Sequence, residues 1–223
     1  MISDILTIVQ KDLRLDLRRL ENFISLLFFS LIILLVFAFA LPADKESHRL
    51  LAPGIYWVTF LLSGILALNK SFQLERENSV MEALLLAPVS RGAIFLGKML
   101  GNLLFIFIVQ LILIPLFSIL FHTLTPVQYG EMLVLSVIVT TGFTALGTLL
   151  SGLTADLRFK EILLPILLFP LLVPLLLAAV TITRGILDSQ GFGETADWLK
   201  LLIGFDLIYM IVAFLTFDFV MEL

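Results

Sequence analysis

The stretch FISLLFFSLIILLVFAFAL, residues 23–41, decides the class of fold, because it contains 19 residues and no charged side chain. An α-helix of about 20 apolar residues spans the roughly 30 Å hydrocarbon core of a bilayer. The stretch ends in Ala38-Phe39-Ala40, which superficially resembles a signal-peptidase site. A signal sequence has a shorter apolar core of about 7–15 residues. We therefore interpret residues 23–41 as an uncleaved membrane helix.

Five further apolar runs follow the first. The chain of 223 residues is 60% hydrophobic and only 14% charged, whereas a soluble protein carries about 25% charged residues. We therefore predict an all-α membrane protein, with a single transmembrane domain over residues 1–223. The predicted spans are residues 23–41, 53–68, 93–121, 132–153, 162–183 and 201–221, the second of which starts at Pro53, a favourable residue for a first turn.

Residues 1–22, which precede the first span, are predicted to form an amphipathic helix. Leu6, Leu13 and Leu20 belong to an apolar set that recurs at steps of three and four, and Lys11 and Arg14 lie on another face. Such a helix lies in the membrane interface rather than crossing the bilayer. The alternative is a solvated helix that packs against other protein.

The lysines and arginines predict the orientation of the spans. With the N-terminus inside, residues 1–22 hold four of them, residues 69–92 together with Lys98 at the start of the third span hold four, and the segment between the fourth and fifth spans holds two. The sum of 10 inside compares with four outside, and cytoplasmic loops carry the excess of Lys and Arg. Both termini are therefore predicted to be cytoplasmic.

The loop NKSFQLERENSVMEALLLAPVSRG, residues 69–92, is the long polar interruption with a helix of its own. Ser79 and Glu82 form an S-x-x-E capping box, which starts a helix, and Pro88 ends it. This helix is too short to span a bilayer, yet it is apolar. It either docks onto a partner protein or packs against the cytoplasmic ends of its own spans.

Polar residues and prolines inside the spans are further candidates. Asp206 would cost about 2.5–3.5 kcal/mol near the bilayer centre, so it has either a functional role or a structural hydrogen bond. Gln110 fits a hydrogen bond between packed helices. Pro165, Pro170 and Pro174 each remove a backbone hydrogen bond and favour a kink, which serves a moving helix or is simply tolerated in a membrane. The small residues of the fourth span predict close helix packing.

Catalytic and metal-binding chemistry is not expected on this chain. It has no cysteine, which excludes disulfides and thiolate metal sites. Residues 92–98 read G-x-x-x-x-G-K but lack the Ser or Thr of a phosphate-binding loop. They are interpreted as the start of a membrane helix, with Lys98 reaching to the interface. We expect His48 and His122 to be residues of the outer surface rather than metal ligands, and Trp57 and Trp198 to be interfacial anchors.

Residues 75–98, ERENSVMEALLLAPVSRGAIFLGK, resemble the cytoplasmic loop of ABC-2-type exporter permeases, which docks onto the ATPase subunit. The segment APGIYWV at residues 52–58 and the proline-broken stretch from Leu164 to Pro174 are similar to the CcmB family, the membrane subunit of the haem exporter of cytochrome c maturation. The resemblance implies a short coupling helix between spans 2 and 3. The residues that it implies in docking are Glu75, Arg76, Ser79, Glu82, Leu84, Leu85, Leu86, Pro88 and Arg91.

The resemblance also implies a non-catalytic permease of the bacterial inner membrane that pairs with a second copy of itself. Two copies of a cytoplasmic CcmA-like ATPase would bind the ATP and Mg²⁺, so no cofactor is expected on this chain. The complex would include haem-handling CcmC- and CcmD-like membrane subunits and a CcmE-like haem chaperone, which ATP hydrolysis would release. Whether haem itself crosses the permease stays open.

Two other functions remain as alternatives to haem export. One is an ABC-2 permease for another cargo, such as a lipid, a glycan or a drug. The other is an ion-coupled secondary transporter centred on Asp206, although the six spans show no internal repeat of the kind that such transporters carry.

Overall fold

The computed structural model describes residues 2–18, 20–42, 45–77, 89–154 and 160–220, and these residues form helices and short connections without any strand. Six of the helices are long and apolar enough to cross a membrane. The predicted all-α membrane fold is therefore confirmed. The helices are α1 (Ile2–Arg18), α2 (Leu20–Ala40), α3 (Lys45–Glu77), α5 (Arg91–Phe121), α6 (Pro126–Thr154), α7 (Lys160–Leu187), α8 (Gly191–Glu194) and α9 (Ala196–Val220).

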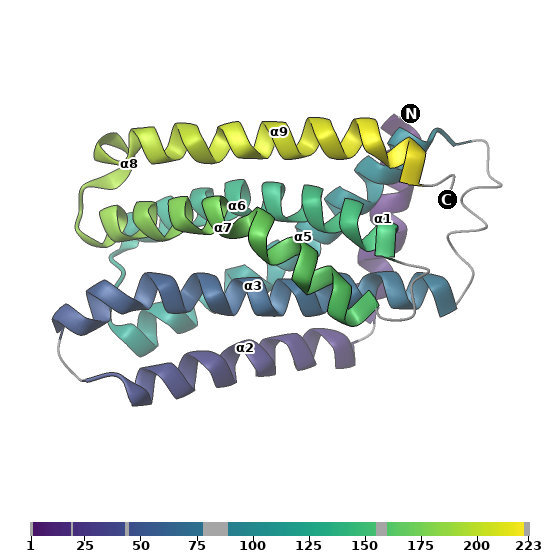
Figure 1. The fold of residues 1–223 in the computed structure, drawn as a ribbon. Helices are drawn as coiled ribbons and strands as arrows, with labels where there is room; N and C mark the ends of the chain where they lie inside the picture. Colours follow the sequence, from purple (N-terminus) through teal and green to yellow (C-terminus); the bar gives the residue numbers. More distant parts are fainter. Residues whose placement is uncertain (1, 19, 43–44, 78–88, 155–159, 221–223) are drawn as a thin grey trace.

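The six long helices run side by side, and α1 lies across one end of their bundle (Figure 1). The N- and C-terminal ends of the chain lie at this same end, as an even number of spans requires. The short helix α8 lies at the opposite end, where it joins α7 to α9. A helix that crosses the end of a bundle has the geometry expected for the interface of a membrane.

Helix α6 forms the centre of the bundle. In its most apolar stretch 72% of the residues are buried within the protein, against 17% for α2 and 22% for α9, which lie at the periphery. The predicted close packing of this span is confirmed. A Cβ atom added at Gly64 of α3 would lie 2.7 Å from the Phe143 ring of α6, and one added at Gly147 of α6 would lie 2.3 Å from Leu68 of α3. The glycines thus let the two backbones approach closely.

The prediction for the second span was wrong in its boundaries. Helix α3 starts at Lys45, so Pro53 lies inside it rather than in its first turn, and it continues through residues 69–77 to Glu77. Its 33 residues reach about 50 Å, more than the bilayer core requires. The end of an apolar run predicts where contact with lipid ends, but it does not predict where the helix ends. Residues 69–77 contain no glycine or proline that would stop the helix.

The other predicted spans agree with helices of the structure, apart from residue 41 just after α2 and residue 221, which lies outside the described residues. Helix α7 carries Pro165, Pro170 and Pro174 and bends along its length, as Figure 1 shows. The predicted kink is therefore present. The short helix α8 has no counterpart among the predicted elements.

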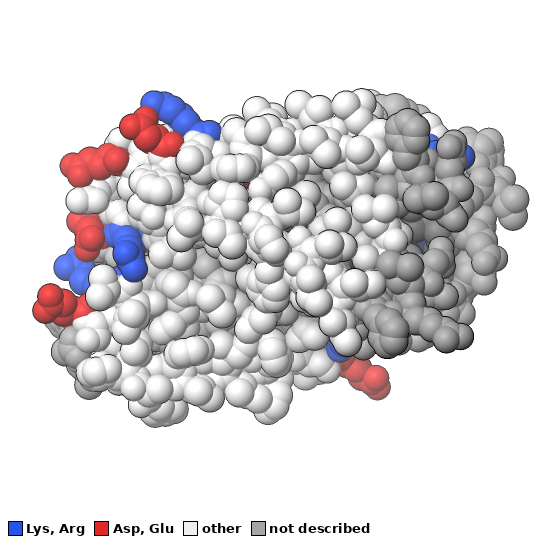
Figure 2. All heavy atoms as spheres, viewed as in Figure 1, with Lys and Arg blue, Asp and Glu red and all other residues white. Residues whose placement is uncertain are grey.

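The charged side chains visible in Figure 2 lie mostly toward the ends of the molecule. In Figure 2 acidic and basic groups cluster at the end that holds α8, and a broad uncharged surface covers the middle of the bundle. Exposed apolar side chains of α2, α7 and α9 include Phe28, Ile166 and Leu207. A wide apolar band bordered by charge is the surface that a bilayer covers.

Candidate functional site

The predicted docking segment lies mostly outside the described residues. Glu75 and Arg76 fall in the last turns of α3, and Arg91 starts α5 with Ser90 as its N-cap residue. The segment therefore joins α3 to α5 at the end of the bundle where α1 lies (Figure 1). Its capping box and short helix stay predictions, because Ser79, Glu82, Leu84, Leu85, Leu86 and Pro88 lie outside the described residues.

The N-terminal helix α1 rests directly on the first turns of α5. A Cβ atom added at Gly97 would lie 2.8 Å from Ile8, and one added at Gly101 would lie 3.3 Å from Asp12. Ile8 is buried in this contact. Gly97 and Gly101 form a G-x-x-x-G pattern, a weak signal on its own, and α1 packs on this pattern. Pairing this pattern with the preceding amphipathic helix would have found the contact from sequence.

Helix α9 holds the same turns of α5. A Cβ atom added at Gly92 would lie 2.8 Å from the ring of Phe214, and the ring of Phe95 packs 5.1 Å, centroid to centroid, from that of Phe217. Residues 92–98 belong to a membrane helix, as expected, rather than to a phosphate-binding loop. Lys98 is only 3% exposed, so its side chain is covered by protein rather than by water. The end of α5 that follows the docking segment is therefore clamped by α1 and α9.

Two amides join α5 to α6 inside the bundle. The side-chain amide of Gln110 donates to the Thr140 hydroxyl at 3.0 Å, and that of Asn102 donates to the Thr148 hydroxyl at 3.3 Å. The Thr140 hydroxyl in turn donates to the backbone carbonyl of Ser136 at 2.6 Å. These bonds lie eight residues apart on both helices, as antiparallel neighbours require. The predicted packing role of Gln110 is confirmed.

Asp206 faces α6 from the opposite direction. Its side chain is only 7% exposed, and a Cβ atom added at Gly142 would lie 2.0 Å from its Oδ1. This oxygen has no hydrogen-bond partner among the described residues. Thr140 and Gly142 are two residues apart, which places them about 200° apart around the helix. Gln110 and Asp206 therefore approach different faces of α6 and do not form one site.

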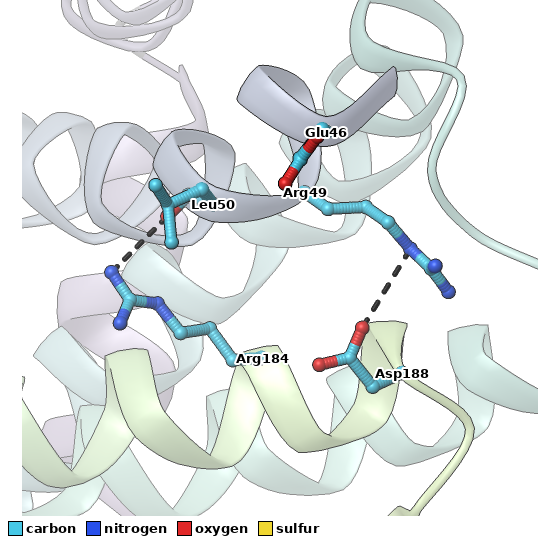
Figure 3. A pocket seen from close by; sticks show the side chains of 5 residues that line it. All are labelled: Glu46, Arg49, Leu50, Arg184 and Asp188. Atoms are coloured by element: carbon cyan, nitrogen blue, oxygen red, sulfur yellow. Dashed lines mark hydrogen bonds and ion pairs between the residues drawn. The ribbon is translucent and has the colours of Figure 1, made fainter.

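At the other end of the bundle, α3 and α7 are joined by reciprocal arginine contacts (Figure 3). The Arg49 guanidinium donates to the Leu187 carbonyl at 2.9 Å and lies 3.7 Å from the Asp188 carboxylate. The Arg184 guanidinium donates to the Leu50 carbonyl at 3.1 Å. The last carbonyls of a helix lack partners within that helix. Arg49 supplies one at the end of α7. These contacts lie at the end of the bundle that the sequence predicts to be the outer one, and together they are called the outer clasp.

A buried hydrogen bond supports the outer clasp. The Trp57 indole N–H of α3 donates to the Thr183 hydroxyl of α7 at 2.8 Å. Trp57 is 1% exposed, so its prediction as an interfacial anchor was wrong, whereas Trp198 is 41% exposed at the start of α9. Indole rings suit the interface, but they are also buried where their N–H finds an acceptor.

The two histidines also lie at this end. The His48 ring packs edge-on against Phe121, with 5.6 Å between ring centroids, and His122 ends α5 with a φ of 53°. No group of three potential metal-ligating side chains occurs among the residues that the structure describes.

Comparison with known proteins identifies the family. The model of the CcmB protein family matches residues 3–222. A protein named heme exporter protein B from Rhodobacter capsulatus is 31% identical over 79% of this chain and 81% of its own length. Proteins of the same name from Pseudomonas aeruginosa and Paracoccus denitrificans are 29% and 32% identical, over 76% and 78% of this chain and 76% and 80% of their own lengths. The chain therefore belongs to the CcmB family.

Proposed function

We propose that this chain is the membrane permease subunit of an ABC-type haem exporter that acts in cytochrome c maturation. The observation that carries the proposal is the family match over residues 3–222, shared with relatives named heme exporter protein B. Six membrane-spanning helices in one bundle agree with a permease. ATP hydrolysis is assigned to a separate subunit, because residues 92–98 form part of a helix.

The coupling segment, residues 69–92, is the proposed contact with that ATPase. The chain enters α5 at Arg91, and the first turns of α5 pack tightly against Ile8 of α1 and Phe214 of α9. A push on the segment would therefore move these helix ends as one body, since close-packed contacts transmit displacement. The hydrogen bonds of Asn102 and Gln110 would carry the displacement from α5 to α6.

The outer clasp is the proposed place where the bundle opens. Hydrogen bonds near water can be exchanged for bonds to solvent at a small net cost. Separation of α3 from α7 would break the Arg49 and Arg184 contacts, and Pro165, Pro170 and Pro174 give α7 a place to bend. The permease would work as a pair with two CcmA-like ATPases, in the bacterial inner membrane with cytoplasmic termini. CcmC- and CcmD-like subunits and a CcmE-like chaperone would complete the complex.

Co-purification with the ATPase tests the coupling segment. Leu85→Asp places a charge on the predicted apolar helix and Glu82→Lys reverses a charge in the predicted capping box, so both are expected to abolish retention of the ATPase and production of c-type cytochromes. Lys200→Gln, at the opposite end of the bundle, is the control. Unchanged assembly and unchanged cytochrome levels in both variants would contradict the proposed contact.

Deletion of the gene tests the assignment to cytochrome c maturation. The expected result is a loss of c-type cytochromes while haem synthesis and b-type cytochromes stay normal. Normal c-type cytochromes in the deletion strain would assign the permease to another cargo.

A further inference from the structure

A cleft of about 440 Å³ opens beside the outer clasp, between α3 and α7. Figure 3 shows its lining, in which Arg184 of α7 and Asp188, just after α7, face Glu46 and Arg49 of α3. Leu50 completes the lining. Two guanidinium groups and two carboxylates thus border one cleft, whose formal charges balance.

The charged groups of the cleft keep unused hydrogen-bonding capacity. A guanidinium carries five N–H donors, whereas Arg184 uses one, toward Leu50, among the described residues. Arg49 contacts Leu187 and Asp188 and has donors to spare. No described residue pairs with the Glu46 carboxylate, whose side chain extends over the cleft in Figure 3. The cleft therefore offers donors for an anion and an acceptor for a cation.

The cleft lies at the boundary of the membrane. Glu46 begins one candidate span and Arg184 lies in the last turn of another, which ends at Leu187. On α7, Val173 and Leu177 lie 11 and seven residues before Arg184, on the same face of the helix, and both are exposed. A molecule held in the cleft would therefore have its polar part at headgroup depth and apolar surface directly below.

We propose that this cleft binds the headgroup of a phospholipid that carries both a phosphate and a primary ammonium group, as phosphatidylethanolamine does. The phosphate accepts hydrogen bonds from Arg184 and Arg49, since guanidinium groups match phosphate oxygens. The ammonium donates to Glu46, and an acyl chain lies along Leu177 and Val173 of α7. Phosphatidylglycerol lacks the cation, and the quaternary ammonium of phosphatidylcholine has no N–H to donate.

Lipid retention by the full complex tests the assignment. The complex is purified in mild detergent and exposed to equal amounts of palmitoyl-oleoyl phosphatidylethanolamine, phosphatidylglycerol and phosphatidylcholine. Native mass spectrometry then counts the lipids that stay bound. We expect about tenfold preference for phosphatidylethanolamine over the other two, which corresponds to the loss of one ionic contact. Soluble glycerophosphoethanolamine at the same concentration should not displace the lipid.

Variants on the two sides of the cleft separate the two charges of the headgroup. Arg184→Gln is expected to lower phosphatidylethanolamine retention about fivefold, through loss of the phosphate contact. Glu46→Gln removes no hydrogen bond to a described residue, and it should abolish the preference over phosphatidylcholine without disturbing the fold. Lys200→Gln, an exposed residue paired with Asp197 outside the cleft, should leave retention unchanged. Equal retention of the three lipids, displacement by the soluble headgroup, or wild-type retention in both cleft variants would overturn the proposal.

Discussion

The two ends of the bundle are held together by different physical means. At the end where α1 lies, α5 packs against Ile8 and Phe214 through Gly92 and Gly97, with little room for even one added carbon atom. At the opposite end, the outer clasp joins α3 to α7 through arginine donors and backbone carbonyls beside an open cleft. Close apolar packing keeps its geometry when one of the packed helices is displaced, whereas exposed polar contacts can be replaced by contacts with water or lipid. The first end therefore suits transmission of movement, and the second suits opening.

The largest effect on stability is expected for Gly97→Leu, which introduces a large side chain at the tightly packed end of the bundle, between α5 and α1. Its side chain must displace Ile8, so α1 should separate from α5 and the free energy of unfolding should fall by about 3 kcal/mol. Thermal unfolding in detergent measures the loss, and c-type cytochrome levels measure the function. Gly204→Leu is the matched control, because nothing lies within 4 Å of a Cβ atom added there. Equal unfolding midpoints for the two variants would contradict the tight contact.

A smaller effect is expected for Thr183→Val, which removes the acceptor of the Trp57 indole. A buried donor left without a partner costs about 1–3 kcal/mol, and the similar shape of valine limits any packing loss. Indole fluorescence during unfolding reports the change. Thr181→Val is the control, because the Thr181 hydroxyl bonds the Leu177 carbonyl of its own helix. If both variants behave alike, Trp57 does not depend on Thr183.

Arg184→Gln should change stability less, by up to about 1 kcal/mol, because its side chain is exposed and its bond can be replaced by water. It should nevertheless loosen the outer ends of α3 and α7. Hydrogen exchange of the backbone amides near Leu50 and Leu187 is the measurement, and faster exchange is expected at both. Unchanged exchange would show that the arginine does not hold the two helices together.

The smallest effect is expected for Lys200→Gln. Lys200 forms an exposed ion pair with Asp197, three residues earlier on the same helix. Exposed pairs of this kind contribute little to stability. Its unfolding midpoint and its cytochrome levels should match the unmodified protein, and a clear loss of either would reveal a partner at this surface.

The sequence predicted what depends on the chemistry of single segments. Apolar runs predicted the spans, because burial in lipid depends on the side chains of one segment. Pro165, Pro170 and Pro174 predicted a bend, because each lacks the backbone N–H that its own helix would use. The extension of α3 beyond its apolar run was not predicted. Residues 69–77 are mostly polar, which ends the apolar run, but their residue types are compatible with a helix.

Contacts between distant segments were harder to predict. Trp57 resembled an interfacial anchor until the structure placed Thr183 beside its indole. The outer clasp joins Arg49 to a carbonyl 138 positions away, and nothing in either local sequence signals the pairing. The contact between α1 and Gly97 could have been predicted, because the amphipathic helix and the G-x-x-x-G pattern are both visible in the sequence and pairing them gives this contact.

Paired distance measurements test the central claim most directly. This chain has no cysteine, so introduced cysteines are its only labelling sites, and it is labelled before it is combined with its ATPase. Spin labels at Leu51→Cys and Leu177→Cys, both exposed, report on α3 and α7, and labels at Leu6→Cys and Leu100→Cys report on α1 and α5. The distances are measured in the complex with its ATPase, before and during ATP turnover. The account predicts that the α3–α7 distance lengthens while the α1–α5 distance stays constant. A constant α3–α7 distance together with a changing α1–α5 distance would contradict it.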